Sequence, residues 1–176
     1  ISSMIFRILF IFPKIEILQT GANLGYAGGN NVGIRHALEQ DADYVCILNN
    51  DITVEPDFLT RLPSVFQTYS YSDVGVVTPL VGEMPDRGRV WALGSAVNWR
   101  TGAVTRLHAG EPVRALRNHD PLEVDIASGA AMLVKREVLE RVGLLDEAFF
   151  LYFEETDWCL RIRQAGYCIL AVPSSV

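Results

Sequence analysis

The chain has 176 residues, a length that suits one domain, and its formal net charge is −6. Hydrophobic residues make up 49% of it and charged residues 20%, which is ordinary for a globular core and argues against intrinsic disorder. No run of Lys or Arg appears, so nucleic-acid binding is disfavoured.

The three cysteines are Cys46, Cys159 and Cys168, and none of them has CxxC spacing. An odd number without a metal-ligand pattern is typical of a reduced, intracellular chain. All three can be small buried hydrophobic residues. We therefore expect a cytoplasmic protein.

The first twelve residues are apolar, but they are fewer than the roughly 20 that a membrane-spanning helix needs. A signal peptide would need a basic lead and a small-residue cleavage site, and neither is clear. We expect a packed strand or helix here. A peripheral contact at the inner face of the cell membrane stays open as the alternative.

Strand patterns and helix patterns alternate along the chain. The predicted strands are 14–20, 43–48, 74–78, 124–134 and 168–172, and the predicted helices open at 28–31 and at about 56 and span 136–142 and 154–165. The continuous apolar run 43–48 is typical of a central strand buried on both faces. Gly143 is expected to end the predicted helix 136–142. The alternation predicts an α/β fold with a mainly parallel sheet between helices, as one domain over 1–176.

The stretch 81–122 breaks this alternation. Gly, Pro, Arg and Trp are interspersed there, and we expect loops and a hairpin over one edge of the sheet. Trp91 and Trp99 can either stack on a sugar or pack within the hairpin. His108 and His119 lack metal-ligand spacing, so we interpret them as loop residues.

The residues Asn49, Asn50 and Asp51 follow the apolar strand 43–48 directly. Ligands of open α/β sheets bind at the carboxyl ends of strands. If the strand continued, Asn49 and Asp51 would point the same way, and one Asp51 oxygen plus diphosphate oxygens could hold Mg²⁺ or Mn²⁺. The alternative is an Asx turn, because Asn and Asp are good turn formers.

Three acids, Glu154, Glu155 and Asp157, lie at the start of the last predicted helix. They can simply match the helix dipole, and Arg161 can pair with Asp157 four residues earlier. Crowded carboxylates near aromatic residues can also raise one pKa and produce a general base.

Two stretches of small residues complete the set of candidate sites. Asn23, Gly25 and 28–31 form an amide-rich loop before a helix, which suits a diphosphate, although GxGxxG and P-loop patterns are both absent. Residues 128–131 (SGAA) are expected within a strand, either for tight packing or for close approach of a substrate.

Three stretches in this order resemble family 2 glycosyltransferases, which have the GT-A fold. They are 23–38 (NLGYAGGNNVGIRHAL), 43–59 (DYVCILNNDITVEPDFL) and 128–167, which begins SGAAMLVKREVLERVGL. The resemblance extends over nearly the whole chain except 1–12 and 81–122. It is strongest to the rhamnosyltransferase-like branch that builds bacterial surface polysaccharides.

The resemblance implies a role for each matching residue. Asp51 matches the metal-binding aspartate of the family's DxD motif, and Asn49 replaces the first aspartate. Glu155 matches the presumed catalytic base of the ED motif, and because Glu replaces Asp, Asp157 stays as the alternative base. The other residues implied in substrate binding are Asn23, Gly25 and Asn31 near the nucleotide-sugar, Asn50, Glu154, and Gly129 and Ala130 on the acceptor side, where 81–122 is a variable insertion.

The implied reaction is transfer of a sugar, with inversion, from a UDP- or dTDP-sugar to a glycan or a lipid-linked acceptor, assisted by Mg²⁺ or Mn²⁺. Family members usually begin with a strand, a helix and a second strand that lie before the point matched by 12–14. An N-terminally incomplete fold is therefore expected. An inactive fragment or partner module is the first alternative, and a nucleotidyltransferase is the second.

Overall fold

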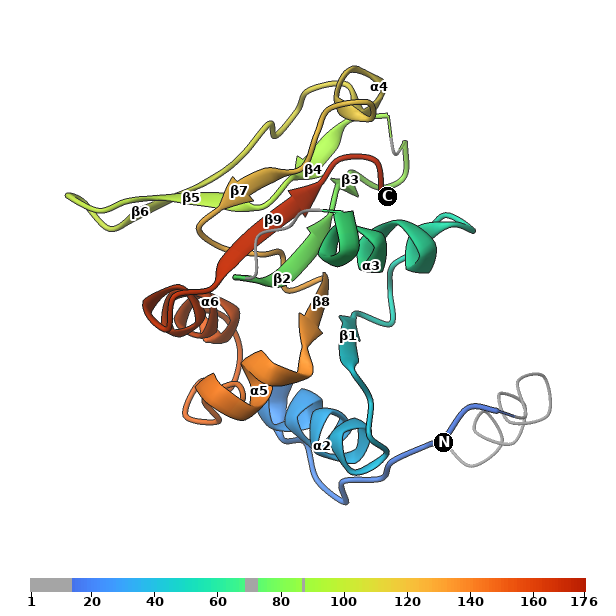
Figure 1. Ribbon diagram of the computed structural model, residues 1–176, viewed down its shortest axis with the longest axis vertical. Coiled ribbons are helices and arrows are strands. Elements are labelled where there is room, and N and C mark those ends of the chain that lie inside the picture. The colour runs from blue at the N-terminus through green and yellow to red at the C-terminus, as the bar shows by residue number, and fades with distance from the viewer. Residues whose placement is uncertain (1–13, 69–72, 87) are drawn as a thin grey trace.

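The computed structural model describes residues 14–68, 73–86 and 88–176. Its main sheet has the strand order β1–β8–β2–β9–β7 (Figure 1). The strands are β1 (Tyr44–Leu48), β2 (Val74–Pro79), β7 (Leu122–Val124), β8 (Ala131–Lys135) and β9 (Cys168–Val172), and the longer helices are α2 (Gly25–Glu39), α3 (Phe58–Thr68), α5 (Arg136–Val142) and α6 (Glu154–Gln164). The predicted α/β class is confirmed.

Helices cover both faces of the sheet, because successive strand residues point to opposite sides. On one face, Met132 and Ile169 pack with buried residues of α2, α5 and α6, among them Trp158. On the other face, Leu133 and Leu170 pack against α3. The carboxyl ends of β1 and β2 and the first turns of α2 and α6 are thereby fixed around one core.

The strand directions differ from the expectation of a mainly parallel sheet. β8 runs antiparallel to both β1 and β2, and β7 runs antiparallel to β9. Among the described strands, β2 and β9 form the only parallel pair of neighbours. The reason is that β8 enters between β1 and β2 from the long 81–130 segment, not through a helical crossover, which parallel neighbours require.

The strand β1 is not buried on both faces, so that prediction was wrong. It pairs with β8 alone at one end of the described sheet. Tyr44 is 38% exposed and Leu48 42% exposed. A continuous apolar run therefore does not by itself reveal whether a strand has one neighbour or two.

Two further strand predictions were also wrong. Residues 14–20 form no strand, since no described strand pairs with them, and Glu16 instead bonds His36 of α2 at 2.6 Å. The predicted strand 124–134 is interrupted, because Ser95 pairs with Ile126 and residues 129–130 form a turn before β8. The prediction for residues 1–12 lies outside the described residues.

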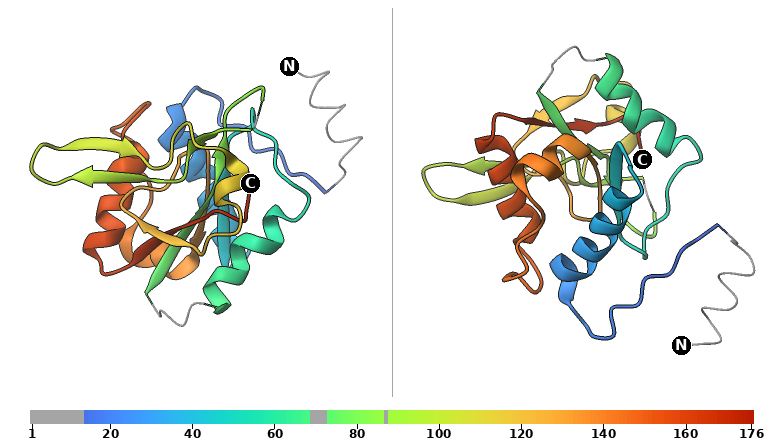
Figure 2. Two further views of the ribbon diagram at one scale, coloured as in Figure 1. Left: turned by 90° about the horizontal axis from the view of Figure 1, so that it is seen from above. Right: turned by 60° about the horizontal axis from the view of Figure 1, so that its bottom comes forward.

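The stretch 81–122 contains loops and a hairpin, as expected. Its elements are β3 (Val81–Gly82), β4 (Val90–Ala92), β5 (Ser95–Asn98), β6 (Ala103–Arg106) and α4 (Val113–Leu116). The β5–β6 hairpin projects from the body of the molecule (Figures 1 and 2), and Trp99 near its tip is 68% exposed. Within the described ranges, no helix has the length and apolar character needed to span a bilayer.

Candidate active site

Helix α6 begins with the three predicted carboxylates in its first turn. The two residues before it, Tyr152 and Phe153, both have a left-handed backbone with φ of 70°, which turns the chain into the helix. The negative charges lie at the positive end of the helix dipole, which is favourable for them. The carboxylates of Glu154, Glu155 and Asp157 nevertheless have three different environments.

Glu155 faces a cavity of about 500 Å³ between the start of α6 and the β5–β6 hairpin. The lining includes Trp91, Ser95, Arg106, Ser128, Gly129 and Phe153. Burial raises the pKa of Glu155, bonds from the backbone N–H groups of Glu155 and Thr156 oppose the rise, and repulsion from Glu154 adds to it. A half-buried carboxylate with a raised pKa beside a cavity has the properties of a general base.

Glu154 is buried, with 4% of its surface exposed. Its Oε2 atom has no hydrogen-bond partner within the described part of the chain. A buried carboxylate oxygen without a partner is costly, and the charge of Glu154 adds to the rise in pKa of Glu155 and of Tyr26. Glu154 thus influences the site electrostatically.

Tyr26, in the first turn of α2, is a site residue that sequence reasoning missed. Its hydroxyl donates a hydrogen bond to the Gly129 carbonyl. Burial raises the pKa of Tyr26, and the charges of Glu155 and Glu154 add to this. A Cβ atom on Gly129 would lie 3.5 Å from both the Tyr26 hydroxyl and the Glu155 Cγ atom. Tyr26 and Glu155 therefore both lie beside Gly129, and the only sequence signal for Tyr26 was its place in the matching stretch 23–38.

The 128–130 turn connects this region to the end of β1. The Asn49 N–H donates to the Ala130 carbonyl at 2.9 Å, next to Gly129. The strand ends at Leu48, and Asn50 and Asp51 lie exposed in a turn. The strand does not continue to Asp51, so the condition under which Asn49 and Asp51 would point the same way is not met, and the alternative of a turn applies.

The loop before α2 is tied to the segment that leads into α6. The Asn23 side chain accepts a bond from Gly25 N at 3.0 Å, and Tyr26 N donates to Phe150 O at 2.9 Å. Gly25 has φ of +70°, and a Cβ there would lie 2.2 Å from Phe150 O. The site thus requires glycine at position 25.

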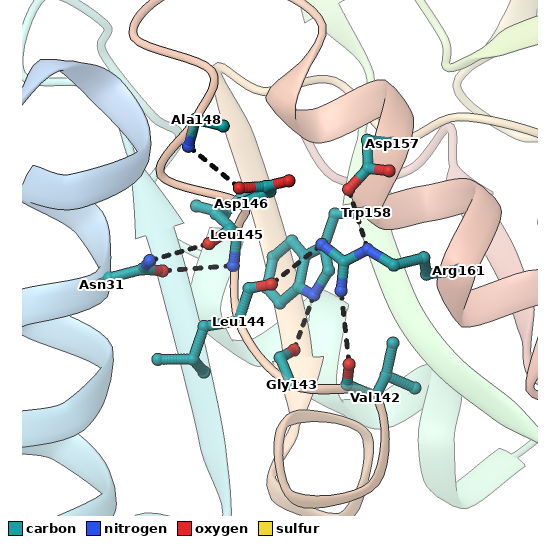
Figure 3. Close-up of polar contacts among 10 residues, drawn as sticks. All are labelled: Asn31, Val142, Gly143, Leu144, Leu145, Asp146, Ala148, Asp157, Trp158 and Arg161. Atoms are coloured by element: carbon teal, nitrogen blue, oxygen red, sulfur yellow. Dashed lines mark hydrogen bonds and ion pairs between the residues drawn. The ribbon is translucent and has the colours of Figure 1, made fainter.

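Asn31 and Asp157 have structural contacts in this site (Figure 3). Asn31 is 1% exposed, and its side chain bonds the N–H and the carbonyl of Leu145. The Asp157 carboxylate accepts a bond from Arg161 Nε at 2.8 Å. Among the three acids, Glu155 is the one that lines the cavity.

A family model described as "Glycosyltransferase like family 2" matches residues 5–176. The chain belongs to this family. Within the family it is 30% identical over 154 residues to the low-salt glycan biosynthesis hexosyltransferase Agl10 of Haloferax volcanii, covering 85% of this chain and 47% of the relative.

Two other relatives are named rhamnosyltransferases. The dTDP-rhamnosyl transferase RfbF of Shigella flexneri is 24% identical, with 91% of this chain and 50% of the relative covered. The N-acetylglucosaminyl-diphospho-decaprenol L-rhamnosyltransferase of Mycobacterium tuberculosis is 28% identical, with 93% and 58% covered. The chain therefore spans about half the length of the curated relatives that it matches.

A solved structure of another glycosyltransferase confirms the GT-A fold. The crystal structure of GalNAc-T7 with UDP, GalNAc and Mn²⁺ superimposes with a TM-score of 0.66 at 17% identity. It covers 99% of this chain and 34% of the other. At this identity the likeness concerns the fold alone.

The residues of this family 2 domain could hold a divalent cation through a single carboxylate, that of Asp51. Within 14–68, 73–86 and 88–176, no three His, Cys, Asp or Glu side chains are grouped so that they could hold a metal ion. Asp51 is exposed at the strand end. A single carboxylate that shares the ion with substrate phosphates and water is a common arrangement for Mg²⁺.

The charge of Glu154 gives a testable pH dependence. In Glu154→Gln, the repulsion that raises the pKa of Glu155 is removed, so that pKa should fall. A base must be deprotonated to act, so the acidic limb of the kcat profile should move to lower pH. The matched control is Glu137→Gln, an exposed glutamate of α5, which should leave the limb where it is. A limb that moves upward or not at all in Glu154→Gln would contradict the assignment of Glu155 as the titrating base.

Proposed function

We propose that the intact protein transfers a sugar from a nucleoside-diphosphate sugar to an acceptor hydroxyl, with inversion at the anomeric carbon. The observation that carries the proposal is the position of Glu155, which lines the cavity of about 500 Å³ and has a raised pKa. Asp157 pairs with Arg161 instead. The protein would act in the synthesis of a cell-surface polysaccharide, as its rhamnosyltransferase relatives suggest.

Glu155 would remove the proton from the acceptor hydroxyl as that oxygen attacks the anomeric carbon. Partial burial raises its pKa, which makes it a stronger base than an exposed glutamate. Inversion in one step requires no protein nucleophile. Tyr26 would keep the 128–130 turn in place beside Glu155, since the Tyr26 hydroxyl donates a hydrogen bond to Gly129 O.

Asp51 would hold Mg²⁺ or Mn²⁺ together with the diphosphate, and the ion would supply charge stabilisation for the leaving group. Asn49 and Asn50 lie next to Asp51 after β1 and would contact the nucleotide. The Asn49 N–H is already bonded to Ala130 O, so its side-chain amide is the group that can reach a ligand.

The donor would be a UDP- or dTDP-sugar. One relative is named for dTDP-rhamnose transfer, and the structural neighbour was crystallised with UDP.

The acceptor would be a glycan or a lipid-linked sugar, because one relative is named for a diphospho-decaprenol substrate. The Asn23 side chain and the Gly25 backbone would shape the donor side, and Gly129 and Ala130 the acceptor side beside the 81–122 insertion. The free cysteines agree with a cytoplasmic location, and a peripheral contact with the inner face of the membrane belongs to the same proposal.

The direct test is calorimetry of the full-length protein with UDP- and dTDP-sugars in the presence of Mn²⁺. Asp51→Ala should weaken binding by about 10–100-fold, the effect of losing one charge-assisted contact. Asp57→Ala is the matched control, because Asp57 forms a surface ion pair with Arg61 at 2.6 Å and should leave binding unchanged. Equal affinities of the wild type and Asp51→Ala would show that Asp51 does not hold the metal.

Product analysis separates the alternatives. Release of a nucleoside diphosphate supports sugar transfer, and release of inorganic diphosphate from a nucleoside triphosphate and a sugar phosphate would support a nucleotidyltransferase. A full-length protein that binds no nucleotide-sugar would support the partner-module alternative.

A further inference from the structure

Four successive carbonyls at the end of α5 are bonded by side chains of two other helices (Figure 3). In residues 142–145, the first three carbonyls accept bonds from Arg161, Trp158 and Arg161 again, at 3.2, 2.8 and 2.9 Å. The fourth accepts a bond from the Asn31 amide at 2.8 Å. The Val142 carbonyl is one of the last in α5 and has no partner within the helix, and the next three belong to the segment that follows it. Side chains of α2 and α6 therefore satisfy all four carbonyls.

The Arg161 guanidinium uses all three of its nitrogens in this arrangement. Its Nε donates to Asp157 Oδ2 at 2.8 Å, and its two terminal nitrogens donate to the carbonyls of Val142 and Leu144. The fork geometry of arginine suits such simultaneous bonding, and an ammonium group could not reproduce it. Asp157 therefore orients Arg161, and Arg161 attaches α6 to the 142–145 segment.

The same segment is attached to α2 through Asn31. The first turn of α2 carries Tyr26, which contacts Gly129, and the first turn of α6 carries Glu155, which lies beside the same glycine. Because both helices are bonded to 142–145, this segment contributes, together with the bond from Tyr26 N to Phe150 O, to the separation of the Tyr26 hydroxyl and the Glu155 carboxylate.

We propose that Asp157 and Arg161 are positioning residues that hold the start of α6, and with it the Glu155 carboxylate, at the acceptor cavity. This inference rests on the proposed function for the role of Glu155. It assigns Asp157 a role that requires a hydrogen-bond acceptor but no proton transfer.

Two substitutions of Asp157 separate these roles in the full-length protein. Asp157→Asn keeps an oxygen that accepts from Arg161 Nε, and Asp157→Ala removes it, but both remove the same charge. We expect Asp157→Asn to keep kcat within about threefold, whereas Asp157→Ala and Arg161→Lys lower it by about 10–100-fold through misplacement of the base. KM for the donor should change little, since the nucleotide contacts are elsewhere.

A destabilised variant controls for a purely structural effect. Val65→Ala removes buried volume in α3, on the opposite face of the sheet. At equal loss of Tm it should leave kcat per folded molecule unchanged. If Asp157→Ala lowers kcat no more than Val65→Ala does, the pair contributes only to stability and the inference is wrong. If Asp157→Asn is as inactive as Asp157→Ala, kcat depends on the charge of Asp157 and not on its hydrogen bond to Arg161, and the inference is also wrong.

Amide hydrogen exchange tests the attachment without any need for activity. In Asp157→Ala and Arg161→Lys, exchange should become faster in both 142–145 and the first turn of α6, and it should stay unchanged in α3. Unchanged exchange at 142–145 would overturn the inference. A wild-type protein that transfers no sugar but shows the expected exchange pattern would contradict the proposed function and leave the attachment of the helices established.

Discussion

Glu155→Gln should lower kcat by about 10²–10⁴-fold, the range that general bases contribute, while binding of the nucleotide-sugar is retained. The amide has nearly the same shape as the carboxylate but cannot remove the proton from the acceptor hydroxyl. Initial rates with a saturating donor, together with calorimetry of donor binding, measure the two effects separately. Activity within a few-fold of wild type would remove Glu155 from the mechanism.

The same substitution should not destabilise the protein at neutral pH. Burial raises the folded-state pKa of Glu155 above its ordinary value of 4.5, so the ionised group opposes folding. The favourable contribution of this carboxyl group is complete below pH 4.5 and is lost as pH rises through the folded pKa. Hence Tm of Glu155→Gln should equal or exceed that of the wild type at pH 7, and the difference should vanish toward pH 4. A clear decrease of Tm at pH 7 would contradict the burial argument.

Gly25→Ala should destabilise the protein by about 2–5 kcal/mol, the sum of a left-handed backbone penalty and steric overlap. Gly25 has φ of +70°, and the added Cβ would lie 2.2 Å from Phe150 O and 2.9 Å from Phe150 Cδ2. Relief of this overlap requires the 23–26 loop to move away from the segment before α6. Denaturant titration measures the loss of stability, and donor affinity should fall with it.

Gly21→Ala is the matched control, because Gly21 has nearly the same φ, +72°, but nothing within 4 Å of the added Cβ. It should cost only the backbone penalty of about 1–2 kcal/mol. Equal destabilisation by the two substitutions would show that Phe150 can move away without cost and that its close contact with position 25 does not contribute to the loss of stability.

The local order of motifs was sufficient to predict the fold class and the acidic start of α6. The predicted strands 43–48, 74–78 and 168–172 and the helix signals at 136 and 154 correspond to β1, β2, β9, α5 and α6. The resemblance of three stretches led to the family, which a match over 5–176 confirmed. These features are readable because each depends on residues close together in the chain.

The sheet directions could not be predicted in the same way. The insertion of β8 between β1 and β2 depends on pairing between residues such as Cys46 and Leu133, which are far apart in sequence. The break at 125–130 depends on Ser95 pairing with Ile126. Periodicity reports which face of a strand is apolar, but not which strand lies beside it.

The sequence by itself determined that carboxylates gather at the start of a helix and that Asp51 follows a strand. Only the tertiary structure distinguished those carboxylates: Glu155 lines a cavity, Asp157 pairs with Arg161, and Glu154 is buried with no partner for its Oε2 among the described residues. The physical reason is that burial and hydrogen-bond partners are contributed by α2, the 128–130 turn and the 142–145 segment. Residues within one helical turn share the sequence signal of a charged helix start, whereas their proton affinities depend on what packs against each one.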